Sequence, residues 1–423
     1  MGLGKKLGQY NTNTGIQIQN SQEPLSIGGY NSYNIANLPV AQPLNDNDKS
    51  HIKSLEADIY TDYSRVLQNS YYNQNLPQNT NGLLKPAIPV GAEYPCGEVS
   101  SLVVEKMWRI ICLKGLYQFY TQDDLQILVN RVCKHDYRVL QDQWNLPTLD
   151  MTTDLAILGL YDIVIFADDS GSMATIEPTE DNMKRFDIMR TVIETIGFWS
   201  TLMDPDGIVV RFFNSSIEGN GIGNNSDVSK LFNKVKPNGS TPMGKNLKSK
   251  IFNKIIQPVI NAHELSRPVL IITVTDGVPD SQSDVINSIC EIKNFCSQTL
   301  YGSNTVAFSF AQIGTDSDAT KYLNQLDSHQ QVGNIIDCTS EFSIEQKQCG
   351  QGFNESVWVI KLMIGAIDPS YDQSDEIGNS NLHNIPNLPN LHNIPNPSAP
   401  PIVAQAYPID SINSGSIFNF GLG

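Results

Sequence analysis

The segment Tyr161–Met173, YDIVIFADDSGSM, joins a continuous apolar run to two carboxylates and two hydroxyls. Its first half contains the unbroken row 163–167 of β-branched, aromatic and small residues, which is typical of a strand buried on both faces. Its second half places Asp168, Asp169, Ser170 and Ser172 where that strand should end. Such a junction suits three kinds of site: a catalytic nucleophile, a phosphate-binding loop or a metal site.

Three later runs have the same strand character, namely GIVVRFF from 207, RPVLIITVTDG from 267 and NTVAFSFAQIG from 304. Helix-patterned stretches lie between the runs, at 182–203, 243–260 and 283–296, and a last apolar helix is expected at 355–367. Strands that alternate with helices of this length predict βαβ units. We therefore expect residues 159–368 to form an α/β domain with a doubly wound, mostly parallel sheet flanked by helices.

The residues before this domain divide into two parts. Segment 1–95 is rich in Asn, Gln, Tyr and Ser and is predicted to be disordered, because it has too few apolar residues for a packed core. Within it, 51–67 has helical spacing and suits a docking helix or a transient solvated helix equally well. Segment 96–158 is predicted to be a small helical extension, with Thr121 as the N-cap of one helix.

The end of the chain returns to low complexity. Segment 369–423 is rich in Asn and Pro and repeats NLHNIPN at 381 and 390, which favours an extended, disordered tail. His383 and His392 recur with the repeat, so duplication explains them better than paired metal ligands do.

Composition limits the partners. The formal net charge is -16, from 44 acidic against 28 basic residues, which argues against nucleic acid because phosphate binding depends on Lys and Arg. No window approaches the length of a membrane span, and the N-terminal residues lack the apolar stretch of a signal peptide. The seven Cys form no C-x-x-C pair, which favours buried thiols in a reducing compartment. We expect a cytoplasmic protein.

Five oxygen-bearing side chains follow predicted strands or stand in a loop between them. Asp168, Ser170 and Ser172 follow the first strand, Asp276 ends the run VLIITVTDG, and Thr241 lies in the loop NGSTPMG. Ligands in open α/β sheets bind beyond the carboxyl ends of the strands. Two carboxylates and three hydroxyls are hard donors that suit Mg²⁺ or Mn²⁺.

The pattern D-x-S-x-S, followed by a distant Thr and a distant Asp after a strand, resembles the metal-ion-dependent adhesion site of von Willebrand factor A domains. The resemblance covers Tyr161–Asp368, and all five motif positions are present. It implies that Ser170, Ser172 and Thr241 coordinate the ion through hydroxyls, while the two aspartates act directly or through water. Asp169 occupies the variable position of the motif, where we expect a solvated carboxylate or one that supports the ligands.

The resemblance also implies a function. Neutral hydroxyls balance a divalent ion only in part, so the ion would stay electrophilic toward an Asp or Glu carboxylate of a protein partner. We therefore expect a metal-dependent protein-binding module and not an enzyme. The flanking segments LPTLDMTTDLAILGL and KLMIGAIDPSYDQSDE also resemble a group of intracellular eukaryotic proteins of unassigned function built on the same domain.

Other interpretations have weaker support. Residues 239–245 nearly match a P-loop, but Asn246 replaces the Ser or Thr that would bind Mg²⁺, and a helix and turn precede them where the motif requires a strand. A serine nucleophile lacks an obvious base. A metal-assisted hydrolase and a scaffold with a vestigial metal site stay open as alternatives. The sequence does not indicate an oligomeric state.

Overall fold

The central sheet has six strands in the described part of the chain, in the order β3-β2-β1-β4-β5-β6. The structure is a computed structural model that describes residues 99–178, 182–342, 344–345 and 354–371. The predicted disordered segment 1–95, most of 369–423 and the helix-patterned stretch 51–67 lie outside these residues. Neighbouring strands run parallel except for β2 and β3. The predicted mostly parallel α/β fold is therefore confirmed.

The four strands predicted from apolar runs form the middle of this sheet. Every residue of these strands is buried, as expected for strands covered by helices on both faces. Their bounds are β1 Asp162–Ala167, β2 Ile208–Phe212, β4 Val269–Thr275 and β5 Val306–Gln312.

Two edge strands were not predicted. Strand β3, Glu218–Ile222, has the sequence EGNGI, which contains two glycines and shows no apolar pattern. It lies at the edge of the sheet and is partly exposed. Strand β6, Ile336–Thr339, has only four residues. Both pair with a neighbouring strand on one side, so their formation depends on the rest of the sheet more than on their own residues.

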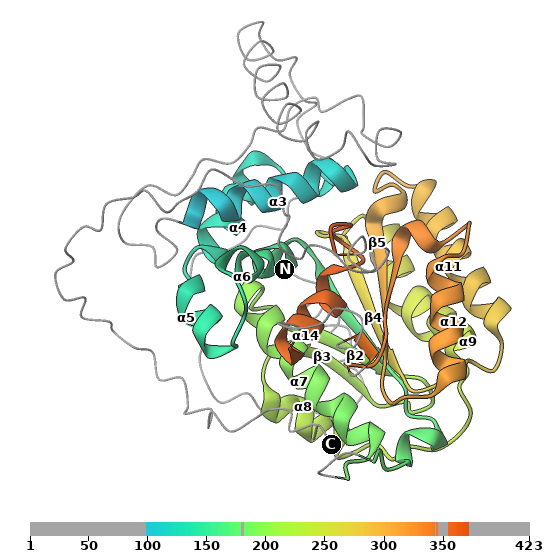
Figure 1. Cartoon of the computed structure of the whole chain (residues 1–423). Helices are drawn as coiled ribbons and strands as arrows, with labels where there is room; N and C mark the ends of the chain where they lie inside the picture. The colour runs from blue at the N-terminus through green and yellow to red at the C-terminus, as the bar shows by residue number, and fades with distance from the viewer. Residues whose placement is uncertain (1–98, 179–181, 343, 346–353, 372–423) are drawn as a thin grey trace, which may run out of the picture.

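Helices cover both faces of the sheet (Figure 1). In the view of Figure 1, α9, α11 and α12 lie to one side, and α7 and α14 lie to the other. Among the described residues, the α- and π-helices of this domain include α7 Arg185–Met203, α8 Asn225–Phe232, α9 Met243–Asn246, a π-helix Leu247–Ile256, α10 Gln257–Asn261, α11 Gln282–Ser297, α12 Ser317–Asp327 and α14 Glu355–Ile364.

Residues 99–160 form a set of helices, where the sequence predicted a small helical extension at 96–158. They are α3 Ser100–Lys114, α4 Gln122–Val132, α5 Tyr137–Gln143 and α6 Leu149–Asp154, followed by a 3₁₀ turn at Leu155–Leu160. Thr121 caps α4 as predicted, in a capping box with Asp124.

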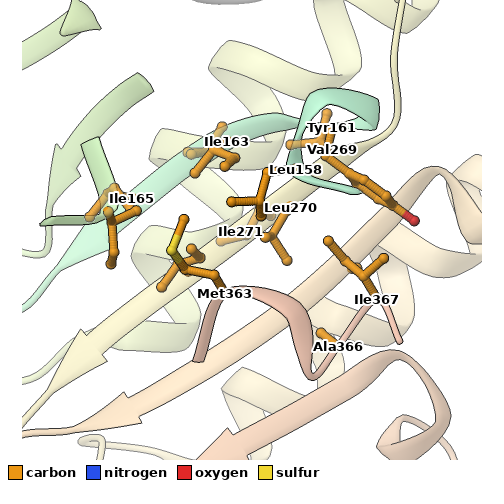
Figure 2. Close-up of a cluster of buried hydrophobic side chains, with 14 of the residues drawn as sticks. Leu158, Tyr161, Ile163, Ile165, Val269, Leu270, Ile271, Met363, Ala366 and Ile367 are labelled. Atoms are coloured by element: carbon orange, nitrogen blue, oxygen red, sulfur yellow. The ribbon is translucent and has the colours of Figure 1, made fainter. Parts of the chain in front are cut away.

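These helices share their apolar core with the sheet. Leu158 from the 3₁₀ turn, Ile163 from β1, Leu270 from β4 and Met363 from α14 belong to one buried cluster (Figure 2). The charged neighbours Lys134 and Asp136 favour a solvated helix face for His135, but His135 is half-buried, and its Nε2 lies 2.7 Å from the carbonyl oxygen of Leu202 in α7. That expectation was wrong, because the helical segment packs on α7 at this point.

The strand order sets the place of a ligand site. The chain passes from β1 to β2 and β3 on one side, and then crosses to β4 on the other side of β1. The strands β1 and β4 are thus the topological switch point, outside which open α/β sheets bind their ligands. Within the described residues, no helix combines the length and the apolar character that crossing a membrane requires.

Candidate metal site

Two aspartates leave the sheet side by side. The residue pair Ala167 and Val274 ends the β1–β4 register, and the backbone N–H of Asp168 donates to the Val274 carbonyl at 2.9 Å. Asp276 follows β4 two residues beyond Val274. The two predicted carboxylates therefore meet at the carboxyl edge of the sheet, and both residues are buried, at 0% and 1% exposed.

The carboxylate of Asp168 is held by two donors. Its Oδ1 accepts from the Ser170 backbone N–H at 2.8 Å, and its Oδ2 accepts from the Thr275 hydroxyl at 2.6 Å. Burial raises the pKa of Asp168 to about 6, although hydrogen bonds from Thr275 and Ser170 act in the opposite direction. Thr275 was not predicted as a site residue. Thr275 could have been identified from its position, because it directly precedes Asp276 at the end of a strand that pairs with β1.

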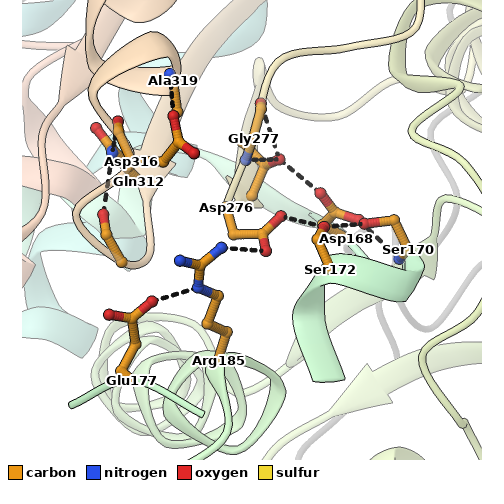
Figure 3. A network of polar contacts seen from close by, with 12 residues as sticks. Asp168, Ser170, Ser172, Glu177, Arg185, Asp276, Gly277, Gln312, Asp316 and Ala319 are labelled. Atoms are coloured by element: carbon orange, nitrogen blue, oxygen red, sulfur yellow. Dashed lines mark hydrogen bonds and ion pairs between the residues drawn. The ribbon is translucent and has the colours of Figure 1, made fainter. Parts of the chain in front are cut away.

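Ser170, Ser172 and Asp276 form a chain of close oxygen atoms (Figure 3). The hydroxyl oxygens of the two serines are 3.0 Å apart, and the Ser172 hydroxyl donates to Asp276 Oδ1 at 2.8 Å. Ligand oxygens at roughly 2.0–2.1 Å from Mg²⁺ in an octahedron are about 2.9 Å from one another along each edge. The oxygen spacing of this chain fits adjacent positions around such an ion.

Thr241 lies in a loop at the same edge. The Gly171 backbone N–H donates to the Gly239 carbonyl at 3.0 Å, which joins this loop to the serine loop. Asp280 holds it from the other side, because its carboxylate accepts from the Thr241 N–H at 2.9 Å and from the Ser240 hydroxyl at 2.6 Å. Among the described residues, the Thr241 hydroxyl has no hydrogen bond to the other four predicted ligands. The structure therefore brings four of the five together and places the fifth in the adjoining loop.

Asp169 is a structural carboxylate. Its oxygens accept from the backbone N–H groups of Asn214 at 2.6 Å and Ser215 at 2.7 Å, and its own carbonyl accepts from Asn238 N–H at 2.7 Å. The residue is 1% exposed, so the solvated alternative was wrong. Asp169 instead supports the ligands, because it ties the loop after β2 and the loop of Thr241 to the end of β1.

Arg185 and Glu177 extend the polar network beyond the predicted residues (Figure 3). The Arg185 guanidinium donates to Asp276 Oδ2 at 2.9 Å through one terminal nitrogen and pairs with Glu177 through Nε. Burial acts to lower the pKa of Arg185, but its hydrogen bonds to Asp276 and Glu177 raise it above its usual value. A Cβ at Gly314 would lie only 2.5 Å from the Glu177 carboxylate, so the backbone there packs against the pair. No local sequence signal pointed to these contacts.

The alternative sites fit the structure less well. The near-P-loop at 239–245 follows α8 and a loop, whereas a P-loop follows a strand. The described residues contain no group of three or more His, Cys, Asp and Glu side chains that could hold a metal. The candidate site would depend instead on hydroxyls together with two carboxylates.

Comparisons with known proteins add little to this geometry. No protein-family model matches the chain, and no curated protein matches it. One matching solved structure is the crystal structure of the manganese-loaded Plasmodium vivax TRAP protein, with 18% sequence identity, coverage of 49% of this chain and 74% of that chain, and a TM-score of 0.31. So low a score carries no argument, and the resemblance to von Willebrand factor A domains stays a prediction based on the five motif residues.

Proposed function

We propose that this chain is a divalent-cation-dependent protein-binding module, with Mg²⁺ or Mn²⁺ held by Asp168, Ser170, Ser172, Thr241 and Asp276. The observation that carries the proposal is the chain of oxygen atoms from Ser170 through Ser172 to Asp276, whose spacings of 3.0 and 2.8 Å match adjacent positions around a six-coordinate ion. A bound ion would supply a Lewis-acid position for an incoming oxygen donor.

The surroundings of the oxygen chain support binding to a partner. Gly171, Ser172 and Ser240 are exposed, whereas Asp168 and Asp276 are buried beneath them. An incoming group would therefore meet Ser172 before either carboxylate, whereas Ser170 is buried with them. Five protein ligands leave at least one of six positions open, and a carboxylate from an Asp or Glu of the partner would add the negative charge that hydroxyls do not supply.

The same geometry favours binding over catalysis. Within the candidate site, burial raises the pKa of Asp168, but both of its oxygens accept hydrogen bonds and the residue is 0% exposed. A general base needs a free oxygen within reach of the proton that it removes. His135 contacts Leu202, and His329 accepts from the backbone N–H of Gln331, so both have structural contacts of their own.

The test is capture of proteins by the full chain and by Thr241→Ala, each with Mg²⁺ and with EDTA. We expect a set of proteins that only the wild type with Mg²⁺ captures strongly. Pre-incubation of the wild type with an Asp-containing or Glu-containing peptide from a captured protein should displace that protein, whereas the matching Asn or Gln peptide should not. Equal capture in all four samples would refute the proposal.

A further inference from the structure

Both carboxylate oxygens of Asp276 are already engaged. Oδ1 accepts from the Ser172 hydroxyl at 2.8 Å, and Oδ2 accepts from Arg185 at 2.9 Å. The Asp276 side chain is 0% exposed and that of Arg185 is 16% exposed, so little water competes for the ion pair. Charge-assisted hydrogen bonds of this kind are stronger than neutral ones. Asp276 is thus fixed in position at both ends of its carboxylate.

Arg185 is fixed in turn by its other acidic partner. Its Nε pairs with Glu177, whose side chain is 8% exposed, and the backbone at Gly314 packs against this contact. A guanidinium can hold two carboxylates at once because its donors form a rigid fork. Arg185 therefore joins Asp276 to the loop that precedes α7.

This arrangement has two consequences for an ion at the site. Asp276 can offer the ion only Oδ1, which lies beside the Ser172 hydroxyl, because Oδ2 is held by Arg185. Arg185 also offsets the negative charge of Asp276. Both effects leave the ion less fully balanced than two freely placed carboxylates would.

We propose that Arg185 is a positioning residue that keeps Oδ2 of Asp276 away from the divalent ion and offsets the Asp276 charge, which weakens metal binding but keeps a coordination position and net positive charge for a partner carboxylate. This inference rests on the proposed function. It leads to an unusual expectation, namely that removal of a residue beside the site should tighten metal binding.

The test uses calorimetric Mn²⁺ titration of the full chain. Loss of Arg185 alone would leave Glu177 buried and unpaired, so the comparison is between Glu177→Gln and the double variant Glu177→Gln/Arg185→Gln. Arg190→Gln is the matched control, because Arg190 is also in α7 but pairs with Asp187 and Glu194. We expect the double variant to bind Mn²⁺ about tenfold or more tightly than Glu177→Gln, and Arg190→Gln to match the wild type.

Water-proton relaxation by bound Mn²⁺ provides a second measurement, because it reports exchangeable water on the ion. The double variant should lose relaxation enhancement as the freed Oδ2 of Asp276 replaces a water, and added acetate should lower the enhancement less than in Glu177→Gln. Equal or weaker Mn²⁺ binding by the double variant would overturn the inference and leave the proposed function intact. Absence of Mn²⁺ binding in every protein would overturn both. Binding by the double variant alone would support the role of Arg185 and refute a functional metal site in the natural chain.

Discussion

Replacement of Asp168 by Asn should separate metal binding from folding. The side chain is buried, with one oxygen bonded to the Ser170 N–H and the other to the Thr275 hydroxyl. Asn has nearly the same shape, its oxygen can accept from Ser170, and its amide can donate to the Thr275 oxygen. The fold should therefore tolerate the change, while one of the two predicted carboxylate ligands loses its charge.

The expected effect on metal binding is large. A unit charge pair at about 4 Å interacts by roughly 4 kcal/mol at an effective dielectric constant of about 20, and a divalent ion doubles the charge. Mg²⁺ at about 100 times its dissociation constant stabilises the folded state by only about 2.7 kcal/mol. Loss of the Asp168 charge should therefore remove the whole stabilisation at the same Mg²⁺ concentration.

Thermal melts in Mg²⁺ and in EDTA measure this effect. At about 2–4 °C per kcal/mol for a domain of this size, the wild type should melt roughly 5–10 °C higher in Mg²⁺, and Asp168→Asn should show almost no difference. Asp318→Asn is the control, because Asp318 is an exposed acid in α12 that pairs with Lys321. A full Mg²⁺ shift in Asp168→Asn, or none in the wild type, would refute the assigned ligand set.

Three further predictions concern other parts of the molecule. Thr241→Ala should keep the wild-type melting temperature in EDTA but lose most of its rise in Mg²⁺. A chain of residues 97–371 should be soluble and should have a higher melting temperature than one that ends at Ser370. The reason is that the Tyr371 hydroxyl donates to buried Asp154 at 2.6 Å, and a hydrogen bond to a charged group is worth about 1.5–3 kcal/mol. Equal melting temperatures would contradict this. Burial raises the pKa of the Glu355 carboxyl to about 7 from 4.5. The stability that this carboxyl contributes is therefore fully present below about pH 4.5 and is lost as the pH rises toward 7. Glu355→Gln should remove this loss, as measured by the free energy of urea unfolding at about pH 5 and at about pH 8.

The sequence predicted the centre of the fold for a clear physical reason. Strands β1 and β4 are buried on both faces, so nearly every residue must be apolar, and a run such as VLIITVT has few other uses. Because parallel strands end at the same edge, the acids that follow two such runs must come together. Edge strand β3 has no such constraint, since its glycines are placed by pairing with β2.

Neighbouring residues of the same type were harder to separate. Asp168 and Asp169 are adjacent and chemically identical, yet one faces the serines and the other bonds the backbone at Asn214 and Ser215. Only the path of the loop after β2 decides which acid has which role. The motif allows any residue at its second position, which Asp169 occupies here. The motif therefore does not predict that Asp169 joins three loops in this chain.

The largest gap between sequence and structure concerns charge. The predicted ligands are two carboxylates and three hydroxyls. How strongly the Asp276 charge would act on an ion depends on Arg185, which donates to that carboxylate. Arg185 follows Ser172 by 13 positions and enters the site from the start of α7. Arg185 would not be a ligand, so no ligand motif contains it. Its contact depends on where α7 begins and on the second bond to Glu177. The electrophilic character of a bound ion would therefore depend on the ion pairs around the site as well as on the hydroxyl-rich ligand set. Substitution of Thr241 tests the contribution of the ligand set, and substitution of Arg185 tests that of the ion pairs.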